Sequence, residues 1–323
     1  MDRQGRGAAI LRRAGLSLVV ALGLAAADTP ELSAIRASRW MARDADPVRV
    51  LGFVEQECLR PAIGDDAYLV EVGRAAFRTL LLLGGQAARV GVSCETCHQG
   101  GRRNPDFLFP GLSGAPGTAD VTTALFSSHR DDGIDNPRPI PDLSGPKTRL
   151  KVSQDPAAST LERFIHGQIT EEFNGAEPPP AVLKGLADYV RALRPEACPA
   201  QERRPLHEAD EAGNAVRAVR VAIEALDRRD PDTAVLMAAS ARGQLGLIYE
   251  RYDQPAATAS RAALTAADAD LAAAQARIRA HDAAAREDLI LWLVHWRAAA
   301  ASLSADEAGS LFSAGRLAAG AIK

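Results

Sequence analysis

The amino-acid sequence predicts an all-α protein in two parts, a loop-rich region followed by an Ala-rich antiparallel helical bundle. Residues 99–199 hold 13 of the 19 prolines, which favour turns and loops over long helices. Residues 205–323 hold 36 alanines and only two prolines after Pro205, and alanine has the strongest intrinsic helix propensity. Apolar side chains in this second region recur at spacings of three and four, as Val219 and Ile223 do.

The first 27 residues are typical of an export signal. Four arginines up to Arg13 precede an uncharged run from Ala14 to Ala27, and the three alanines before Asp28 fit a signal-peptidase site. The run is short for a membrane span. We expect residues 1–27 to be a signal peptide, cleaved near Ala27 to leave a periplasmic or otherwise extracytoplasmic chain with no transmembrane segment. An uncleaved membrane anchor is the alternative.

Residues 28–65 are expected to form a helical, amphipathic segment. Apolar side chains recur along it, among them Trp40, Met41, Leu51 and Phe53. We expect this segment to pack on the domain that follows it and to contribute no site of its own.

The chemistry of the chain is indicated by Cys94-Glu95-Thr96-Cys97-His98, a C-x-x-C-H pentapeptide typical of c-type haem attachment. Two thiols three positions apart on one helical turn can each add to a haem vinyl group, and the adjacent histidine can then bind the iron. We therefore expect residues 66–198 to be a mono-haem cytochrome c domain with one haem c per chain. Cys94 and Cys97 would attach it covalently, and His98 would be the proximal iron ligand.

Other uses of the cysteines compete with this interpretation. Cys94 and Cys97 could be a thioredoxin-like redox pair, a strained disulfide, or half of a zinc site completed by Cys58 and Cys198. The last two cysteines lack C-x-x-C spacing and bracket the predicted haem domain. Because an oxidising compartment favours pairing, we predict a Cys58–Cys198 disulfide, with two buried free thiols as the alternative.

Five short segments surround or include the motif within residues 66–195. They are Val72–Phe77 (VGRAAF), Val92–His98 (VSCETCH), Ile140–Ser144 (IPDLS), Thr160–Ile165 (TLERFI) and Leu183–Leu193 (LKGLADYVRAL). Together they resemble the haem domains of the bacterial di-haem cytochrome c peroxidase and MauG superfamily. The resemblance implies that the Ile140–Ser144 turn packs over the haem and that the last helix crosses the first.

The chain departs from that family in two respects. It has one C-x-x-C-H motif instead of two, so electron relay between two haems in one chain is excluded. The stretch Leu150–Asp155, where the family places a methionine ligand, contains no methionine, and Met41 and Met237 lie outside the predicted haem domain. His129 and His166 are therefore the candidate distal ligands, and an open iron position is the third possibility.

The loop from Gly100 to Pro146 is long for a compact domain and is expected to wrap the cofactor. Its phenylalanines, Phe107, Phe109 and Phe126, could cover the haem or simply anchor the loop. Its acidic residues, Asp131, Asp132 and Asp135, resemble a calcium loop without the EF-hand spacing.

Residues 199–206 are expected to be a linker, and residues 207–323 a helical bundle of unassigned role. The expected helices are 207–227, 231–251, 255–280, 281–301 and 304–319, with breaks at prolines 231 and 255. Trp292, His295 and Trp296 lie at helical spacing among apolar residues, which favours core packing over a cofactor site.

These patterns predict an exported mono-haem c-type cytochrome that transfers single electrons to or from a partner protein. A peroxidase-like enzyme acting on peroxide at an open iron is the alternative, and a haem-based sensor or docking module is a second alternative. The formal net charge of -3 leaves no basic surplus to neutralise phosphates, so we expect no nucleic-acid partner.

Overall fold

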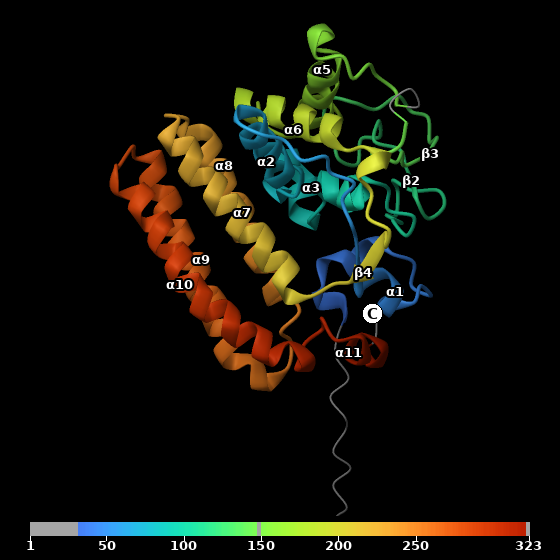
Figure 1. Ribbon diagram of the computed structural model, residues 1–323. Coiled ribbons are helices and arrows are strands. Elements are labelled where there is room, and N and C mark those ends of the chain that lie inside the picture. The colour runs from blue at the N-terminus through green and yellow to red at the C-terminus, as the bar shows by residue number, and fades with distance from the viewer. Residues whose placement is uncertain (1–31, 147–149, 321–323) are drawn as a thin grey trace, which may run out of the picture.

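The computed structural model describes residues 32–146 and 150–320 of the 323-residue chain. Helices dominate it, and its strands form only two short antiparallel pairs, so the predicted all-α class is confirmed (Figure 1). The expected signal peptide, residues 1–27, lies outside the described residues. Within the described ranges, no helix is both long enough and apolar enough to cross a membrane.

The region around the C-x-x-C-H motif consists of short helices and long loops. Its α-helices and its π-helical turn η7 are α2 (Asp65–Phe77), α3 (Gly85–Val90), α4 (Cys94–Cys97), α5 (Thr160–Gly167), η7 (Gln168–Glu172) and α6 (Pro180–Ala192). Its 3-10 helices are η3 (Leu80–Leu83), η4 (Gln99–Gly101), η6 (Pro156–Ala158) and η8 (Pro195–Ala197). In the proline-rich loop, β2 (Thr118–Ala119) pairs with β3 (Arg138–Pro139).

Helices α2 and α6 cross at a pair of glycines, Gly73 and Gly185. A Cβ atom on Gly73 would lie 1.9 Å from the carbonyl oxygen of Gly185, and one on Gly185 would lie 2.6 Å from that of Leu69. The close approach brings Phe77 and Tyr189 together, with ring centroids 5.2 Å apart. Residues 183–193 thus lie on or just after a helix that packs closely on α2.

The N-terminal segment is less helical than expected. It contains the 3-10 turns η1 (Leu32–Ala34) and η2 (Arg36–Trp40), the short helix α1 (Pro47–Leu51) and the strand β1 (Phe53–Glu55). Strand β1 pairs with β4 (Arg203–Pro205), so the expected linker 199–206 is partly a strand. Helix α1 is confined to one turn. Asp46 caps its start by accepting from the backbone N–H of Val48, Pro47 is its first residue, and Gly52 follows its last.

This segment also contacts the opposite end of the chain. Leu32 and Leu51 belong to a buried cluster with Leu311 and Leu317, of which the last lies on α11 (Ala314–Ala319). The N-terminal segment was expected to pack only on the domain that follows it, but it also packs against α11.

The Ala-rich half forms the predicted antiparallel helices. They are α7 (Glu208–Asp227), α8 (Pro231–Tyr249), α9 (Thr258–Arg279) and α10 (Ala284–Asp306), with the turns η9 (Pro255–Ala257) and η10 (Glu307–Gly309). The expected break between residues 301 and 304 is wrong, because no glycine or proline interrupts the alanines there. Helix α11 leaves the bundle (Figure 1).

Trp292 and Trp296 are core residues, as predicted. Their rings stack with centroids 5.2 Å apart, and the indole N–H of Trp292 donates to the carbonyl oxygen of Ala267 at 2.9 Å. The side chain of His295 is exposed, so the predicted core packing is wrong for this residue. These contacts satisfy the one polar atom of Trp292 within the bundle.

The bundle and the motif region share one hydrophobic core. Helix α7 packs on α2, and the hydroxyl of Ser240 on α8 donates to the carbonyl oxygen of Ala75 at 3.0 Å. Arg217 on α7 pairs with Glu71 on α2 at 2.8 Å. The bundle therefore packs, through α7 and α8, against the region that contains the C-x-x-C-H motif.

Candidate haem-binding site

The motif begins a single helical turn, α4, which is fixed at its start by Ser93. The backbone N–H of Ser93 donates to Thr96 Oγ1 at 3.0 Å, and Ser93 Oγ lies 3.4 Å from the same atom, which is a capping-box arrangement. The turn places Cys94 and Cys97 on one side, and His98 closes it through an N–H bond to the carbonyl oxygen of Cys94 at 2.9 Å. Both thiols are free.

The imidazole of His98 is held in one orientation by two backbone carbonyls. Its Nδ1 lies 3.2 Å from the oxygen of Arg102 and 3.1 Å from that of Pro141. A carbonyl can only accept, so Nδ1 carries the proton and Nε2 keeps its lone pair. Burial lowers the pKa of His98, which favours the neutral imidazole that binds metals. Pro141 belongs to the Ile140–Ser144 turn.

Cys94, Cys97 and His98 line a cavity of about 590 Å³. Most of its walls are apolar. They come from α2, η3, α5 and α6, from η7 and the residue after it, from the segment that leads into α4 and from the proline-rich loop: Phe77, Leu83, Val92, Ile140, Leu143, Leu161, Phe164, Ile165, Ile169, Phe173, Leu186 and Val190. Cavities of this size and character hold small-molecule cofactors in other proteins. Burial raises the pKa of both thiols to about 12, so they stay protonated at neutral pH.

These observations test whether the residues present suit a haem. Two free thiols, an imidazole with a free Nε2 and an apolar cavity lie together, which is the set of groups that covalent haem needs. The residues therefore fit the predicted cofactor.

The phenylalanines of the long loop do not reach this cavity. Phe107 and Phe126 are buried but do not line it, and Phe126 packs between Phe109 and Phe173 with centroid distances of 5.2 and 5.7 Å. They anchor the loop, which was the second of the two interpretations. The aromatic lining comes instead from Phe77, Phe164 and Phe173.

Neither candidate distal histidine is among the side chains that line the cavity. His129 has an exposed side chain on the loop, and its backbone N–H donates to Ser127 Oγ. His166 is partly buried, with 35% of its side chain exposed, and its Nε2 lies 2.7 Å from Glu177 Oε2. Met41 and Met237 are buried elsewhere. Ligation by either histidine stays a prediction that would need movement of the chain.

Polar groups also line part of the cavity, and no motif in the sequence predicts them. Lys151, Gln154, Gln168 and Glu172 contribute to its wall. The Oε1 atom of Gln154 is buried without a hydrogen-bond partner, and burial raises the pKa of Glu172. The stretch Leu150–Asp155, which contains no methionine, thus contributes the Gln154 amide to the cavity wall.

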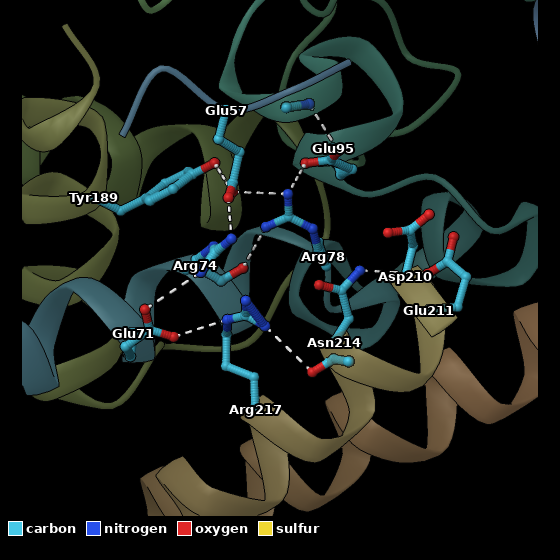
Figure 2. A network of polar contacts seen from close by, with 12 residues as sticks. Glu57, Glu71, Arg74, Arg78, Glu95, Tyr189, Asp210, Glu211, Asn214 and Arg217 are labelled. Atoms are coloured by element: carbon cyan, nitrogen blue, oxygen red, sulfur yellow. Dashed lines mark hydrogen bonds and ion pairs between the residues drawn. The ribbon is translucent and has the colours of Figure 1, made fainter. Parts of the chain in front are cut away.

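A charged network lies behind the motif helix (Figure 2). Arg78 contacts Glu95 at 3.1 Å and Glu57 at 2.9 Å, and the hydroxyl of Tyr189 donates to Glu57 at 2.8 Å. Burial raises the pKa of Glu95 to about 7. Burial also opposes ionisation of Glu57, but Arg78 and Arg74 outweigh it and lower the pKa of Glu57 to about 2. Such a network cannot be read from sequence because its members are up to 132 positions apart.

The remaining cysteines form the predicted disulfide. Cys58 and Cys198 are bonded, with Cα atoms 4.0 Å apart, and their sulfurs cannot then serve a zinc site. Across the residues that the structure places, no group of three or more His, Cys, Asp or Glu side chains could hold a metal ion directly. Asp131, Asp132 and Asp135 are exposed.

Comparison with known proteins yields no assignment. No family model, no curated protein and no solved structure matches the chain. The resemblance to haem domains consequently rests on the short segments around Cys94–His98.

Proposed function

We propose that the chain is an exported mono-haem c-type cytochrome that carries one haem c and transfers single electrons. The observation that supports this most directly is the meeting of two free thiols and an imidazole with a bare Nε2 at the wall of an apolar cavity. Cys94 and Cys97 would attach the haem, and His98 would be its proximal ligand. The redox partner would be another protein.

A bound haem would supply one-electron chemistry through its iron. The chain's own residues prepare the site for that role. The carbonyl oxygens of Arg102 and Pro141 fix the imidazole plane, so Nε2 needs no reorientation on binding. The apolar lining excludes water and lowers the local dielectric, which strengthens the influence of nearby charges on the site.

Attachment is tested by producing the chain with a c-type haem maturation system in a periplasm. We expect haem to remain on the polypeptide after denaturing electrophoresis, and a Cys94→Ala/Cys97→Ala double variant to lose it. His295→Ala is a matched control, because that histidine is exposed on α10 and its variant should keep the haem. A native chain without covalent haem would overturn the proposal.

One observation favours a second candidate, a peroxidase-like enzyme. His129 and His166 do not line the cavity, whereas Gln154 and Glu172 do, and such polar groups could assist peroxide at an open iron. A ferric spectrum that is low-spin and unchanged by cyanide or peroxide would exclude this candidate. A high-spin spectrum with a prompt peroxide reaction would exclude simple electron transfer as the whole function.

The distal ligand is tested in the same spectra. If His129 or His166 binds the iron, replacing that histidine by alanine converts a low-spin spectrum to high-spin. If both variants keep the native spectrum, neither histidine is the ligand.

A further inference from the structure

Helix α10 is apolar on two opposite faces. One face is buried in the bundle, where Trp292 and Trp296 lie and where α10 packs on α7 and α9. The opposite face carries Ile290, Leu291 and Val294, which are 37, 46 and 54% exposed. It lies on the side of the bundle away from α2 and α6 (Figure 1). A helix that is apolar all round is normally covered on every side, and a cluster of exposed apolar side chains marks a surface for association.

The apolar side chains lie between two opposite charges. With 3.6 residues per turn, Glu287, Ile290, Val294 and Arg297 fall within about 80° around the helix axis, and Leu291 lies at the edge of that sector. All five are exposed. We call these five residues the outer face of α10.

The charged residues beside the outer face have partners on neighbouring helices. Arg286 pairs with Asp227 of α7 at 2.6 Å, and Asp288 pairs with Arg277 of α9 at 3.3 Å. These side chains are therefore directed away from the outer face. Glu287 has no hydrogen bond or ion pair with another described residue, and the same is true of Arg297.

The outer face is complementary to itself when two copies run antiparallel. Ile290 and Val294 lie two positions before and after Trp292, and Glu287 and Arg297 lie five positions before and after it. A twofold axis at the level of Trp292 would bring Ile290 opposite Val294 of the second copy. The same axis would bring Glu287 opposite Arg297 of the second copy at both ends of the contact, as a self-complementary interface requires.

We propose that the outer face of α10 is a dimer interface, in which α10 packs antiparallel on α10 of a second copy of this chain. The contact would cover Ile290, Leu291 and Val294 and would form two Glu287–Arg297 ion pairs. A membrane surface suits the face less well, because helices that lie on anionic lipids carry a surplus of lysine and arginine, whereas this face has one acid and one base.

Sedimentation equilibrium of the full exported chain, from micromolar to millimolar concentration, tests the proposal. We expect a reversible equilibrium between monomer and dimer. Val294→Glu should weaken the association about tenfold or more, because it places a carboxylate at the apolar centre of the contact. Ile63→Glu is the matched control, because Ile63 is 88% exposed in the loop before α2 and should leave the association unchanged.

Charge reversal tests the antiparallel arrangement. Glu287→Arg would place arginine opposite arginine at both ends of the contact, and Arg297→Glu would place glutamate opposite glutamate. Each should weaken the association about tenfold or more. The combined Glu287→Arg/Arg297→Glu variant restores opposite charges and should regain most of the native affinity. Asp66→Arg, which reverses an exposed charge on α2, is the control.

Circular dichroism and thermal unfolding show whether each variant is folded, and Val294→Glu and the charge reversals test the proposal separately. A native chain that stays monomeric at millimolar concentration, a dimer that Val294→Glu leaves unchanged, or a combined variant no tighter than the single ones would each overturn the proposal. A monomeric chain that binds phosphatidylglycerol vesicles, and loses this binding with Val294→Glu, would assign the face to a membrane instead.

Discussion

Replacement of Glu95 by glutamine should stabilise the protein at alkaline pH and have little effect at acid pH. Burial raises the pKa of this carboxyl from 4.5 to about 7 in the folded chain. The unfolded chain therefore releases the proton first as the pH rises, and the folded state loses stability between pH 4.5 and pH 7. At 1.36 kcal/mol per pH unit the loss amounts to about 3 kcal/mol. Glutamine resembles the neutral acid and escapes this loss.

The measurement is the free energy of unfolding by urea, followed by circular dichroism at pH 4.5 and pH 8 at one ionic strength. We expect the variant and the native chain to be nearly equal at pH 4.5, and the variant to be more stable by up to about 3 kcal/mol at pH 8. Arg78 keeps its contact with Glu57 at 2.9 Å, so the variant does not strand that guanidinium.

Glu57→Gln provides a control of opposite sign. Its pKa is lowered to about 2, so the charged form stabilises the folded chain above pH 4.5, and that stability is lost as the pH falls toward 2. Glu57→Gln should therefore destabilise the chain at pH 8 by about 3 kcal/mol. An equal effect of Glu95→Gln at both pH values, or a destabilisation at pH 8, would refute the assignment of Glu95 as a carboxyl whose ionisation the fold opposes.

Three further outcomes are expected, each measured by denaturant unfolding. Removing the Cys58–Cys198 bond by alanine substitution should cost about 5 kcal/mol, because the bond closes a loop with a sequence separation of 140; a loss below about 1 kcal/mol would contradict the loop-entropy account. Gly73→Ala should cost about 3 kcal/mol, since its Cβ would collide with the Gly185 carbonyl, whereas Gly213→Ala, with nothing within 4 Å, should be neutral or stabilising. Leu317→Ala should cost about 2–5 kcal/mol if α11 packs on the N-terminal segment as the structure has it, and an effect near zero would show that this contact is not formed in solution.

Much of the fold could be predicted because its causes are local. Alanine content and apolar periodicity predicted four helices of the bundle, and Asp230, Pro231 and the capping of Thr233 set the start of α8 where the sequence placed it. The disulfide followed from the count of cysteines outside the motif. The predicted helix 281–301 ended too early, because nothing in the run of alanines marks the end of α10 at Asp306.

The parts that could not be predicted depend on contacts between distant residues. Strand β1 forms only because residues 203–205 return beside it, and α11 is fixed by Leu32 and Leu51, more than 250 positions earlier. The proximal side of the candidate site was predictable, because the spacing of Cys94, Cys97 and His98 specifies it. The rest of the lining was not, since it comes from segments far apart in the sequence, from Phe77 on α2 to Val190 on α6.

The position of α4 indicates a role for the bundle beside the predicted haem domain. A single turn of helix has almost no stability of its own, and covalent cofactor attachment constrains only the face of Cys94 and Cys97. The other face is held by Glu95, which reaches Arg78 on α2 and accepts from the backbone N–H of Gly100 at 2.8 Å. Helix α2 is in turn fixed by α7 and α8 through Glu71 and Ala75. The bundle thus supports the motif through α2. A displacement of α7 or α8 would move α2 and Arg78, and through Glu95 it would act on the helix that would carry the haem.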